Sequence, residues 1–250
     1  MAYLIEEFIE DTNACSNREE AFELYQKAIG QFGFDSAVYT FITDHKAADI
    51  KAKHAVQCNF PEDWMKHYVA NDYQSIDPAI VYAFRTRFAF SWDDLQKKEF
   101  ITKTQRNILN QAQEAGLNDG VGIPIYGPGG EMAGVGLAGS TKGINPDKAM
   151  LSKLKLFTEQ LHMVYCSLDG DTVLETNPTT EPLTARETEV LKWWAVGKTK
   201  EEIGMILNCS QSNIKRHIES IYKKLNANSQ ILAVIKAIHL GYIQLDLIEY

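Results

Sequence analysis

The sequence predicts an α+β fold: an N-terminal α/β/α sandwich with an antiparallel sheet, followed by an all-α domain of four short helices. Two observations predict this division. Residues 1–166 alternate amphipathic helical segments with short β-prone runs, whereas residues 183–243 carry only helical periodicity. Between them, residues 167–182 are rich in Gly, Pro, Thr and Asp, which suits an exposed connection. We therefore expect domains at 1–166 and 183–250, joined by a linker at 167–182.

The first domain is expected to place helices on both faces of a small sheet. Apolar spacing predicts helices at 1–12, 17–31, 61–73, from Asp77 onward, 103–114 and 146–167, and β-prone runs predict strands at 37–43, 54–59, 121–125 and 133–138. The last two strands are separated by YGPGG at 126–130, which is rich in turn-forming residues. That turn predicts an antiparallel hairpin.

The last predicted strand carries several glycines, and two explanations for them remain open. Gly134, Gly136 and Ala138 share one face by the two-residue period of a strand, whereas Val135 faces the other way. The glycines through Gly139 match the dinucleotide fingerprint in form, but that motif must open a helix, so we reject it. A face with few side chains leaves volume for a ligand or for a bulky helix side chain.

A second cluster of residues combines aromatic rings with one carboxylate. Trp64 and Tyr68 lie one turn apart on a predicted helix, and Asp77 and Trp92 follow. Buried indole N–H, phenol O–H and carboxylate groups need hydrogen-bond partners. They can satisfy one another, which is the usual structural outcome. They can also converge on a small amide- and carbonyl-rich ligand inside an aromatic wall that includes Phe60.

The C-terminal domain is predicted to hold four helices. Thr184 with Glu187 forms a capping box for the first, Thr199 caps the second, and the third spans about 210–225. The third helix is apolar on one face and polar to basic on the other, and two short helices joined by a tight turn fit the DNA major groove. A four-helix helix-turn-helix domain is therefore predicted, against the alternative of a helical bundle with a solvated basic face.

The predicted DNA contacts divide by chemistry. Lys215, Arg216 and Glu219 are expected nearest base edges, because Lys and Arg suit guanine and Glu suits cytosine. The other residues expected at the DNA interface are Thr199, Ser212, Asn213, His217 and Lys223, of which Asn213, His217 and Lys223 are expected nearer phosphates.

The fourth predicted helix, from Ser229 to about Gly241, suggests a dimer. Its apolar stripe consists of Ile231, Val234, Ile235 and Ile238. Four short helices have little core of their own, so this stripe is expected to continue into a partner chain. Paired recognition helices would then read two half-sites of a palindrome.

Composition narrows the function class. The chain has 250 residues and a formal net charge of −8, yet residues 181–250 hold nine Lys and Arg against eight Asp and Glu. The excess acid therefore lies in the first domain, and DNA binding must depend on a local basic surface. Four cysteines show no C-x-x-C pair, which indicates reduced thiols rather than a zinc or disulfide framework.

Other functional classes lack their signatures. We find no catalytic nucleophile set, metal-ligand cluster or phosphate-binding loop, so we expect neither an enzyme nor a bound metal or cofactor. The N-terminus lacks the basic region of a signal peptide, and no apolar run reaches about 18 residues. We therefore expect a cytoplasmic protein without a membrane partner.

The C-terminal segment resembles the LuxR-type helix-turn-helix. The matching motifs are LTARE at 183–187, GKT at 197–199, EI at 202–203, IKRH at 214–217 and KL at 224–225. The chain departs from the family at Asn213, where Thr is usual, and at Gly204, where Ala is usual. Glycine costs a helix interior about 1 kcal/mol relative to Ala. The residues after Ile243 extend beyond the family's usual end, and the sequence does not indicate their role.

The first domain is similar to the acyl-homoserine-lactone-binding domain of the same family. The matching residues are Trp64, Tyr68, Asp77 followed by Pro78, Trp92 and Gly120. The resemblance implies that Trp64 donates to the lactone carbonyl, Tyr68 to the acyl carbonyl, and that Asp77 accepts from the ligand amide. Trp92 would wall the lactone ring. Ala79 and Gly136 stand where some members carry hydroxyl residues, which favours a roomy pocket and a long or bulky acyl group.

The resemblance implies a ligand-responsive transcriptional regulator. It would bind an N-acyl-homoserine lactone, bind a palindromic promoter site in double-stranded DNA as a homodimer, and act on RNA polymerase. Two other regulators remain as alternatives: one of the same fold that senses a non-lactone small molecule, and a phosphorylation-driven response regulator. The latter would need a parallel βα receiver domain, whereas the first domain shows antiparallel signals.

Overall fold

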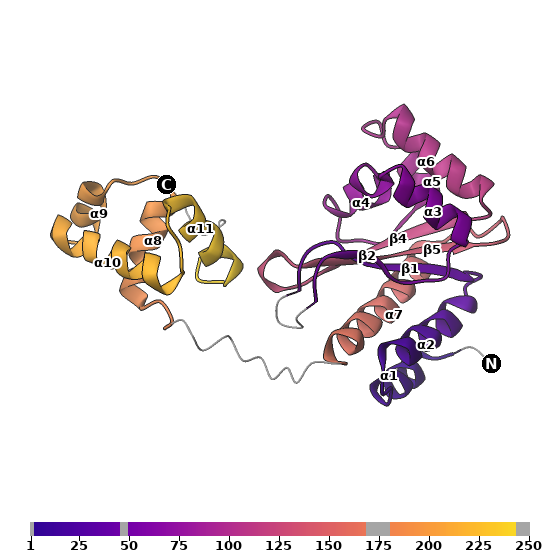
Figure 1. Cartoon of the computed structure of the whole chain (residues 1–250). Coiled ribbons are helices and arrows are strands. Elements are labelled where there is room, and N and C mark those ends of the chain that lie inside the picture. The colour runs from indigo at the N-terminus through magenta and orange to yellow at the C-terminus, as the bar shows by residue number, and fades with distance from the viewer. Residues whose placement is uncertain (1–2, 46–49, 169–180, 244–250) are drawn as a thin grey trace. The chain divides into compact units, whose positions relative to one another are not determined.

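A computed structural model of the chain describes residues 3–45, 50–168 and 181–243. It contains two compact units, each with its own hydrophobic core (Figure 1). The α+β class predicted from the sequence is confirmed. Most of the predicted linker and the tail after Ile243 lie outside the described residues, so the domain boundaries stay predictions. No described helix combines the length and apolar content that crossing a lipid bilayer requires.

The first unit is built on a five-stranded sheet with the order β2-β1-β5-β4-β3. The strands are β1 (Ser36–Phe41), β2 (Lys53–Cys58), β3 (Phe90–Ser91), β4 (Asn118–Tyr126) and β5 (Met132–Gly139). Every described pairing between them is antiparallel, and β4 and β5 form the predicted hairpin. A response-regulator receiver needs a parallel sheet, so this unit does not have that fold.

Helices cover both faces of the sheet (Figure 1). One layer holds α1 (Ile5–Asn13), α2 (Arg18–Gly30) and α7 (Lys148–Ser167), and the other holds α3 (Glu62–Ala70), α4 (Pro78–Ala83), α5 (Trp92–Gln96) and α6 (Lys103–Glu114). The helix expected over 61–73 ends early, because Asp72 adopts a left-handed conformation (φ 49°) before a short 3-10 turn. The sequence patterns gave no sign of β3 and α5.

Large side chains fill only one side of the sheet. Tyr39, Val135 and Leu137 point from the strands into a core that they share with Phe8 and Phe157 of the first helical layer. The predicted alternation along β5 is therefore confirmed: Val135 and Leu137 are buried in this core, while their neighbours along the strand face the second layer. On the opposite face β4 and β5 present small residues, and that is where the candidate site lies.

The second unit holds α8 (Ala185–Ala195), α9 (Lys200–Ile206), α10 (Gln211–Lys224) and α11 (Gln230–His239). The predicted capping box forms at Thr184 with Glu187, and the predicted cap Thr199 forms a second capping box with Glu202. The α9–α10 turn folds back tightly, and the amide of Cys209 donates to the carbonyl of Gly204 (2.8 Å). A Cβ at Gly204 would lie 2.8 Å from the Cys209 carbonyl oxygen, so this departure from the family's alanine fits a closer turn.

Glu187 joins α8 to α10 inside the helical unit. Its carboxylate accepts from the Thr184 amide (2.7 Å), the Ser220 hydroxyl (2.6 Å) and the Lys224 ammonium (2.9 Å). Burial alone would raise the pKa of Glu187, but these hydrogen bonds outweigh it and lower the pKa to about 2. One carboxylate thus caps the first helix and fixes it against the third.

The apolar stripe of α11 is only partly unpartnered. Ala233 and Ala237 are fully buried, and Val234 and Ile238 pack against the unit's own core. Ile231 and Ile235 keep 73% and 57% of their surface exposed. Val234 and Ile238 are thus half-buried by contacts within their own domain, while Ile231 and Ile235 are not, and dimerisation through the stripe stays a prediction.

Glu187→Gln should destabilise the helical unit by roughly 1.5–3 kcal/mol at pH 7, because it removes a charged acceptor from three donors. Because folding lowers the pKa of Glu187 from 4.5 to about 2, its contribution to stability is fully present above pH 4.5. This contribution is lost as the pH falls toward 2. Thermal unfolding of the full chain, followed by circular dichroism, measures the difference. Glu189→Gln is the control: Glu189 is exposed and pairs with Arg186 at the surface of α8, so its effect should stay within about 0.5 kcal/mol. Equal losses in both variants would contradict the role of Glu187.

Candidate functional site

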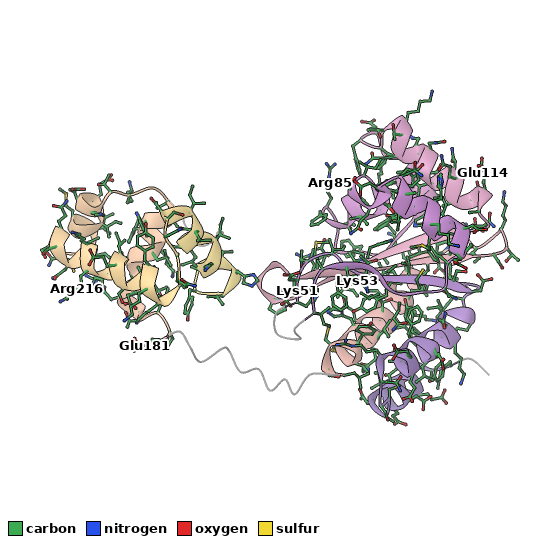
Figure 2. All side chains as sticks on the ribbon, in the orientation of Figure 1. Lys51, Lys53, Arg85, Glu114, Glu181 and Arg216 are labelled. Atoms are coloured by element: carbon green, nitrogen blue, oxygen red, sulfur yellow. The ribbon has the colours of Figure 1, made fainter. Side chains whose placement is uncertain are left out.

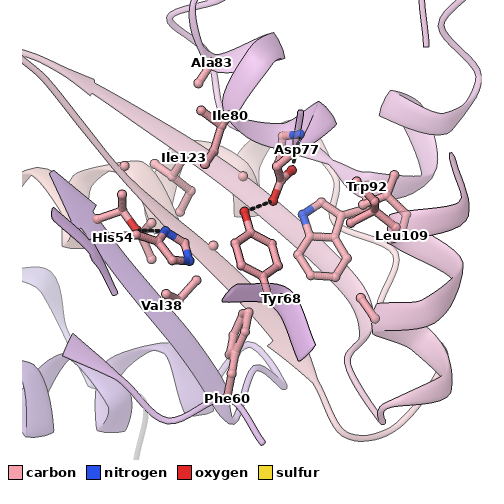
Figure 3. Close-up of a pocket in the computed structure, with 18 of the residues that line it drawn as sticks. Val38, His54, Phe60, Tyr68, Asp77, Ile80, Ala83, Trp92, Leu109 and Ile123 are labelled. Carbon is pink, nitrogen blue, oxygen red and sulfur yellow. Dashed lines mark hydrogen bonds between the residues drawn. The ribbon is translucent and has the colours of Figure 1, made fainter. Parts of the chain in front are cut away.

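A pocket lies between the small-residue face of the sheet and the second helical layer (Figure 3). All seven residues that the sequence assigned to a ligand site line it: Phe60, Trp64, Tyr68, Asp77, Ala79, Trp92 and Gly136. They come from α3, α4, α5, β5 and the connection before α3, segments that are far apart in the sequence. The fold thus brings the predicted constellation together, while ligand binding by these residues stays a prediction.

Asp77 and Tyr68 form the polar centre of the pocket. Asp77 caps α4, where its Oδ1 accepts from the Ala79 amide (2.7 Å) and its Oδ2 accepts from the Tyr68 hydroxyl (2.7 Å). Burial raises the pKa of Asp77, although hydrogen bonds from Tyr68 and Ala79 oppose the shift. Burial and the neighbouring Asp77 raise the pKa of Tyr68, so the phenol keeps its proton.

This hydrogen bond changes the role that the family resemblance implies for Tyr68. A phenol carries one proton, and Tyr68 already donates it to Asp77. Tyr68 can donate to a ligand carbonyl only if that bond breaks. In the present arrangement its hydroxyl fixes the Asp77 carboxylate and offers lone pairs to the pocket.

Trp92 brings an unsatisfied donor to the site. Its indole Nε1 is buried and has no hydrogen-bond partner among the residues that the structure describes. Buried N–H groups are rarely left unpaired, so this atom is a position where a ligand oxygen would be favoured. Trp92 was expected only to wall the lactone ring, and the geometry adds a donor to that apolar surface.

Glycines on β4 make room for the aromatic residues of the pocket. A Cβ at Gly120 would lie 2.0 Å from Cδ2 of Trp92, and a Cβ at Gly122 would lie 2.4 Å from Cζ of Phe90. Real Cβ atoms do not approach other atoms so closely. Gly120 is therefore the residue that lets the Trp92 ring lie directly on the sheet.

The glycines of β5 face a narrower space than expected. A Cβ at Gly136 would lie 3.1 Å from Cγ1 of Val38 and 3.9 Å from Cζ of Phe60. The pocket volume is about 90 Å³, less than the roughly 150 Å³ of an engineered cavity that admits benzene. The expectation of a roomy pocket is wrong for this arrangement, because Val38 and Phe60 occupy part of the space over Gly136. A long acyl chain would need side chains to move.

Sequence reasoning missed several pocket residues, including Thr40 on β1 and His54 on β2. Thr40 lies between Tyr39 and Phe41, which face the opposite core, so the strand period could have indicated it. His54 gave no such signal, because β2 pairs irregularly with β1 at this point.

The residues predicted to bind DNA are gathered on the exposed side of α9 and α10. Ser212, Asn213, Lys215, Arg216, Glu219 and Lys223 are exposed on α10, His217 is half-buried, and Thr199 is exposed at the start of α9. Figure 2 shows Arg216 projecting away from the helices of this unit. Lys215 and Glu219 form an exposed pair at 3.8 Å. The Thr199 hydroxyl accepts from the Glu202 amide, so it also caps α9.

Sequence models of two known families match the chain. The model described as autoinducer binding domain matches residues 17–165, and the model described as bacterial regulatory proteins, luxR family, matches residues 181–237. The chain belongs to the LuxR family. It is a ligand-responsive transcriptional regulator, with an autoinducer-binding domain and a LuxR-type DNA-binding helix-turn-helix.

Named relatives agree with this assignment over most of their length. RhlR of Pseudomonas aeruginosa, an HTH-type quorum-sensing regulator, is 29% identical over 224 residues, which cover 89% of each chain. The transcriptional activator VanR of Vibrio anguillarum is 32% identical over 189 residues, 74% of this chain and 75% of VanR. The crystal structure of Escherichia coli SdiA has the same fold, with a TM-score of 0.62 and 23% identity over 96% of this chain and 98% of that one.

Gly120→Ala should destabilise the first unit by roughly 1–3 kcal/mol, because the new methyl group must displace the Trp92 ring. Chemical denaturation gives the stability, and indole fluorescence reports the environment of Trp92. Gly30→Ala is the matched control, since nothing lies within 4 Å of its Cβ position in α2. That variant should be neutral or slightly more stable. If Gly120→Ala behaved like Gly30→Ala, Trp92 would not depend on close contact with the sheet.

Proposed function

We propose that this regulator binds an N-acyl-homoserine lactone in the pocket of its first domain. We further propose that it binds a palindromic promoter site as a homodimer and acts there on RNA polymerase. The pocket supports the first part by its chemistry, and the exposed surfaces of the helical unit support the second.

The Asp77 carboxylate is the observation that carries the ligand proposal. It is a costly group to bury beside an apolar cavity, and acceptor capacity remains after it accepts from Tyr68 and Ala79. The amide N–H of an acyl-homoserine lactone would supply a further donor. The indole N–H groups of Trp64 and Trp92 supply donors for the lactone carbonyl oxygen and for a second ligand oxygen, and the Trp92 ring supplies an apolar plate.

Asp77→Asn should weaken lactone binding by roughly 1.5–3 kcal/mol, because the charge-assisted acceptor is lost while size is retained. Asparagine is also a good helix N-cap, so α4 should persist. Calorimetry or thermal shift with lactones of four to twelve acyl carbons measures the effect. Asp93→Asn, an exposed position on α5, should leave affinity unchanged. If the wild-type protein bound no lactone of this series, the proposed ligand class would be wrong, and a non-lactone ligand would take its place.

The proposed DNA contacts follow from exposure and charge on α10. Lys215 and Glu219 keep 66% and 62% of their side chains exposed, and Arg216 lies between them. This surface offers donors for guanine and an acceptor for cytosine N4. Asn213, His217 and Lys223 flank it and would contact phosphates, which fixes the register of the helix without reading sequence.

The dimer proposal depends on the apolar residues that α11 leaves exposed. Ile231 and Ile235 on α11 and Leu240 at its C-terminal cap keep 73%, 57% and 56% of their surface accessible. A second copy of the same helix would remove this surface from water. Two recognition helices would then face half-sites about one helical turn of DNA apart.

Ile235→Asp should weaken both dimerisation and binding to a palindrome, because it places a charge in the proposed interface. Sedimentation equilibrium measures the first effect, and titration of a palindrome selected from random duplexes measures the second. Ile235→Leu keeps the apolar surface and should behave like the wild type. Ile235 is largely exposed, so the monomer fold should survive both changes. Wild-type protein that bound a single half-site as tightly as the palindrome would contradict the dimer.

A further inference from the structure

We propose that His54 determines ligand specificity in this pocket by donating a hydrogen bond from its ring Nε2–H to an oxygen on the acyl chain. This inference rests on the proposed lactone function and adds the chemistry of the acyl group to it. The ligand class that fits is an acyl-homoserine lactone with a carbonyl or hydroxyl oxygen on the part of its chain next to the amide.

An irregular strand pairing turns His54 toward the pocket. Tyr39 of β1 pairs with Gln57 of β2, but Phe41 pairs with Lys53, so the single residue Thr40 lies opposite residues 54–56. Ala55 within this bulge adopts a φ of 52°, a left-handed conformation that is uncommon for alanine. Bulges re-aim side chains, and strained backbone of this kind is concentrated at functional sites.

Thr40 fixes which ring nitrogen of His54 carries the proton. The Thr40 hydroxyl oxygen accepts from the Ala55 amide (3.2 Å) and lies 2.9 Å from Nδ1 of His54. The Thr40 hydroxyl and Nδ1 are both satisfied when the hydroxyl donates its one proton to Nδ1. Burial lowers the pKa of His54 to about 4, so the imidazole is neutral near pH 7. Nδ1 is then the acceptor, and the ring proton is on Nε2.

The Nε2–H donor is left for a ligand. The interactions recorded for the His54 side chain among the described residues are its bond to Thr40 and its contact with Tyr68. His54 lines the pocket, and Figure 3 shows its second ring nitrogen turned away from the bond to Thr40. Apolar residues such as Val38 and Ile80 make up much of the surrounding wall. An unsubstituted acyl chain would therefore cover this donor without pairing it, which is costly.

The position of His54 identifies the part of the ligand that it would contact. Its ring stacks on Tyr68, with ring centroids 4.9 Å apart and an interplanar angle of 15°. The Tyr68 hydroxyl contacts Asp77, which marks the proposed amide site. His54 thus lies beside Tyr68, on the side away from Trp92 (Figure 3). His54 would therefore contact the acyl chain near its amide end, and the third acyl carbon is the position that we test.

The test compares matched lactones that differ only at the third acyl carbon. Each unsubstituted chain of four to twelve carbons is paired with its 3-oxo and 3-hydroxy forms, and calorimetry on the full chain gives the affinity ratio. The wild type should prefer an oxygenated form by about 3- to 10-fold, the range of one net hydrogen bond. His54→Phe keeps the stacked ring but has no donor, so its ratio should fall to about 1.

Two controls separate the donor from general damage to the pocket. Thr40→Ser keeps the hydroxyl and should keep the preference. The wild-type ratio should not change between pH 5.5 and 8, because His54 stays neutral above its pKa of about 4. Asp77→Asn should weaken both members of each pair and leave their ratio unchanged.

The outcomes distinguish the role of His54 from the proposed function, lactone binding. Lactone binding without preference for the oxygenated forms would overturn the role of His54 and leave the proposed function standing. A preference that survives in His54→Phe would have the same meaning. If His54→Phe fails to fold, His54→Leu takes its place, and its ratio of affinities for oxygenated and unsubstituted lactones is compared with that of the wild type. Failure of the wild type to bind any lactone would overturn the proposed function and this inference with it.

Discussion

The pocket depends on one constraint: strands β4 and β5 carry large side chains on one face of the sheet and almost none on the other. Val135 and Leu137 fill the core beneath α7, while Gly134 and Gly136 alternate with them along the strand and face the other way. Because side chains alternate along a strand, the same eight residues of β5 both anchor the domain and leave room above it. Gly120 on β4 extends the bare surface and lets Trp92 rest on the backbone.

The second helical layer places hydrogen-bonding groups over this bare face without satisfying all of them. Asp77 is held by Tyr68, and its pKa is raised by burial, while the Trp92 indole N–H has no partner among the described residues. Such groups destabilise a folded domain until something pairs with them. A ligand that pairs with these groups stabilises the native state by mass action. Ligand binding can therefore increase the amount of folded regulator.

The helical unit obtains its rigidity from polar contacts at helix ends. It has four short helices and a small core, so the Glu187 carboxylate, shared by Thr184, Ser220 and Lys224, adds cross-links that apolar packing alone would not supply. These contacts hold α8 against α10 and leave the outer face of α10 exposed. The basic residues on that face make no contacts like those of Glu187, so their side chains can bind a variable surface such as DNA.

Local patterns in the sequence determined most of the element order, the helix caps, the hairpin and part of the pocket lining, because periodicity and turn chemistry act over a few residues. Tertiary structure alone decided the rest. The Tyr68 hydroxyl donates its proton to Asp77, Val38 narrows the space over Gly136, and Val234 of α11 packs against the core of its own unit. His54 enters the pocket only through a strand bulge. Each of these depends on distances between segments far apart in the chain, which no local pattern encodes.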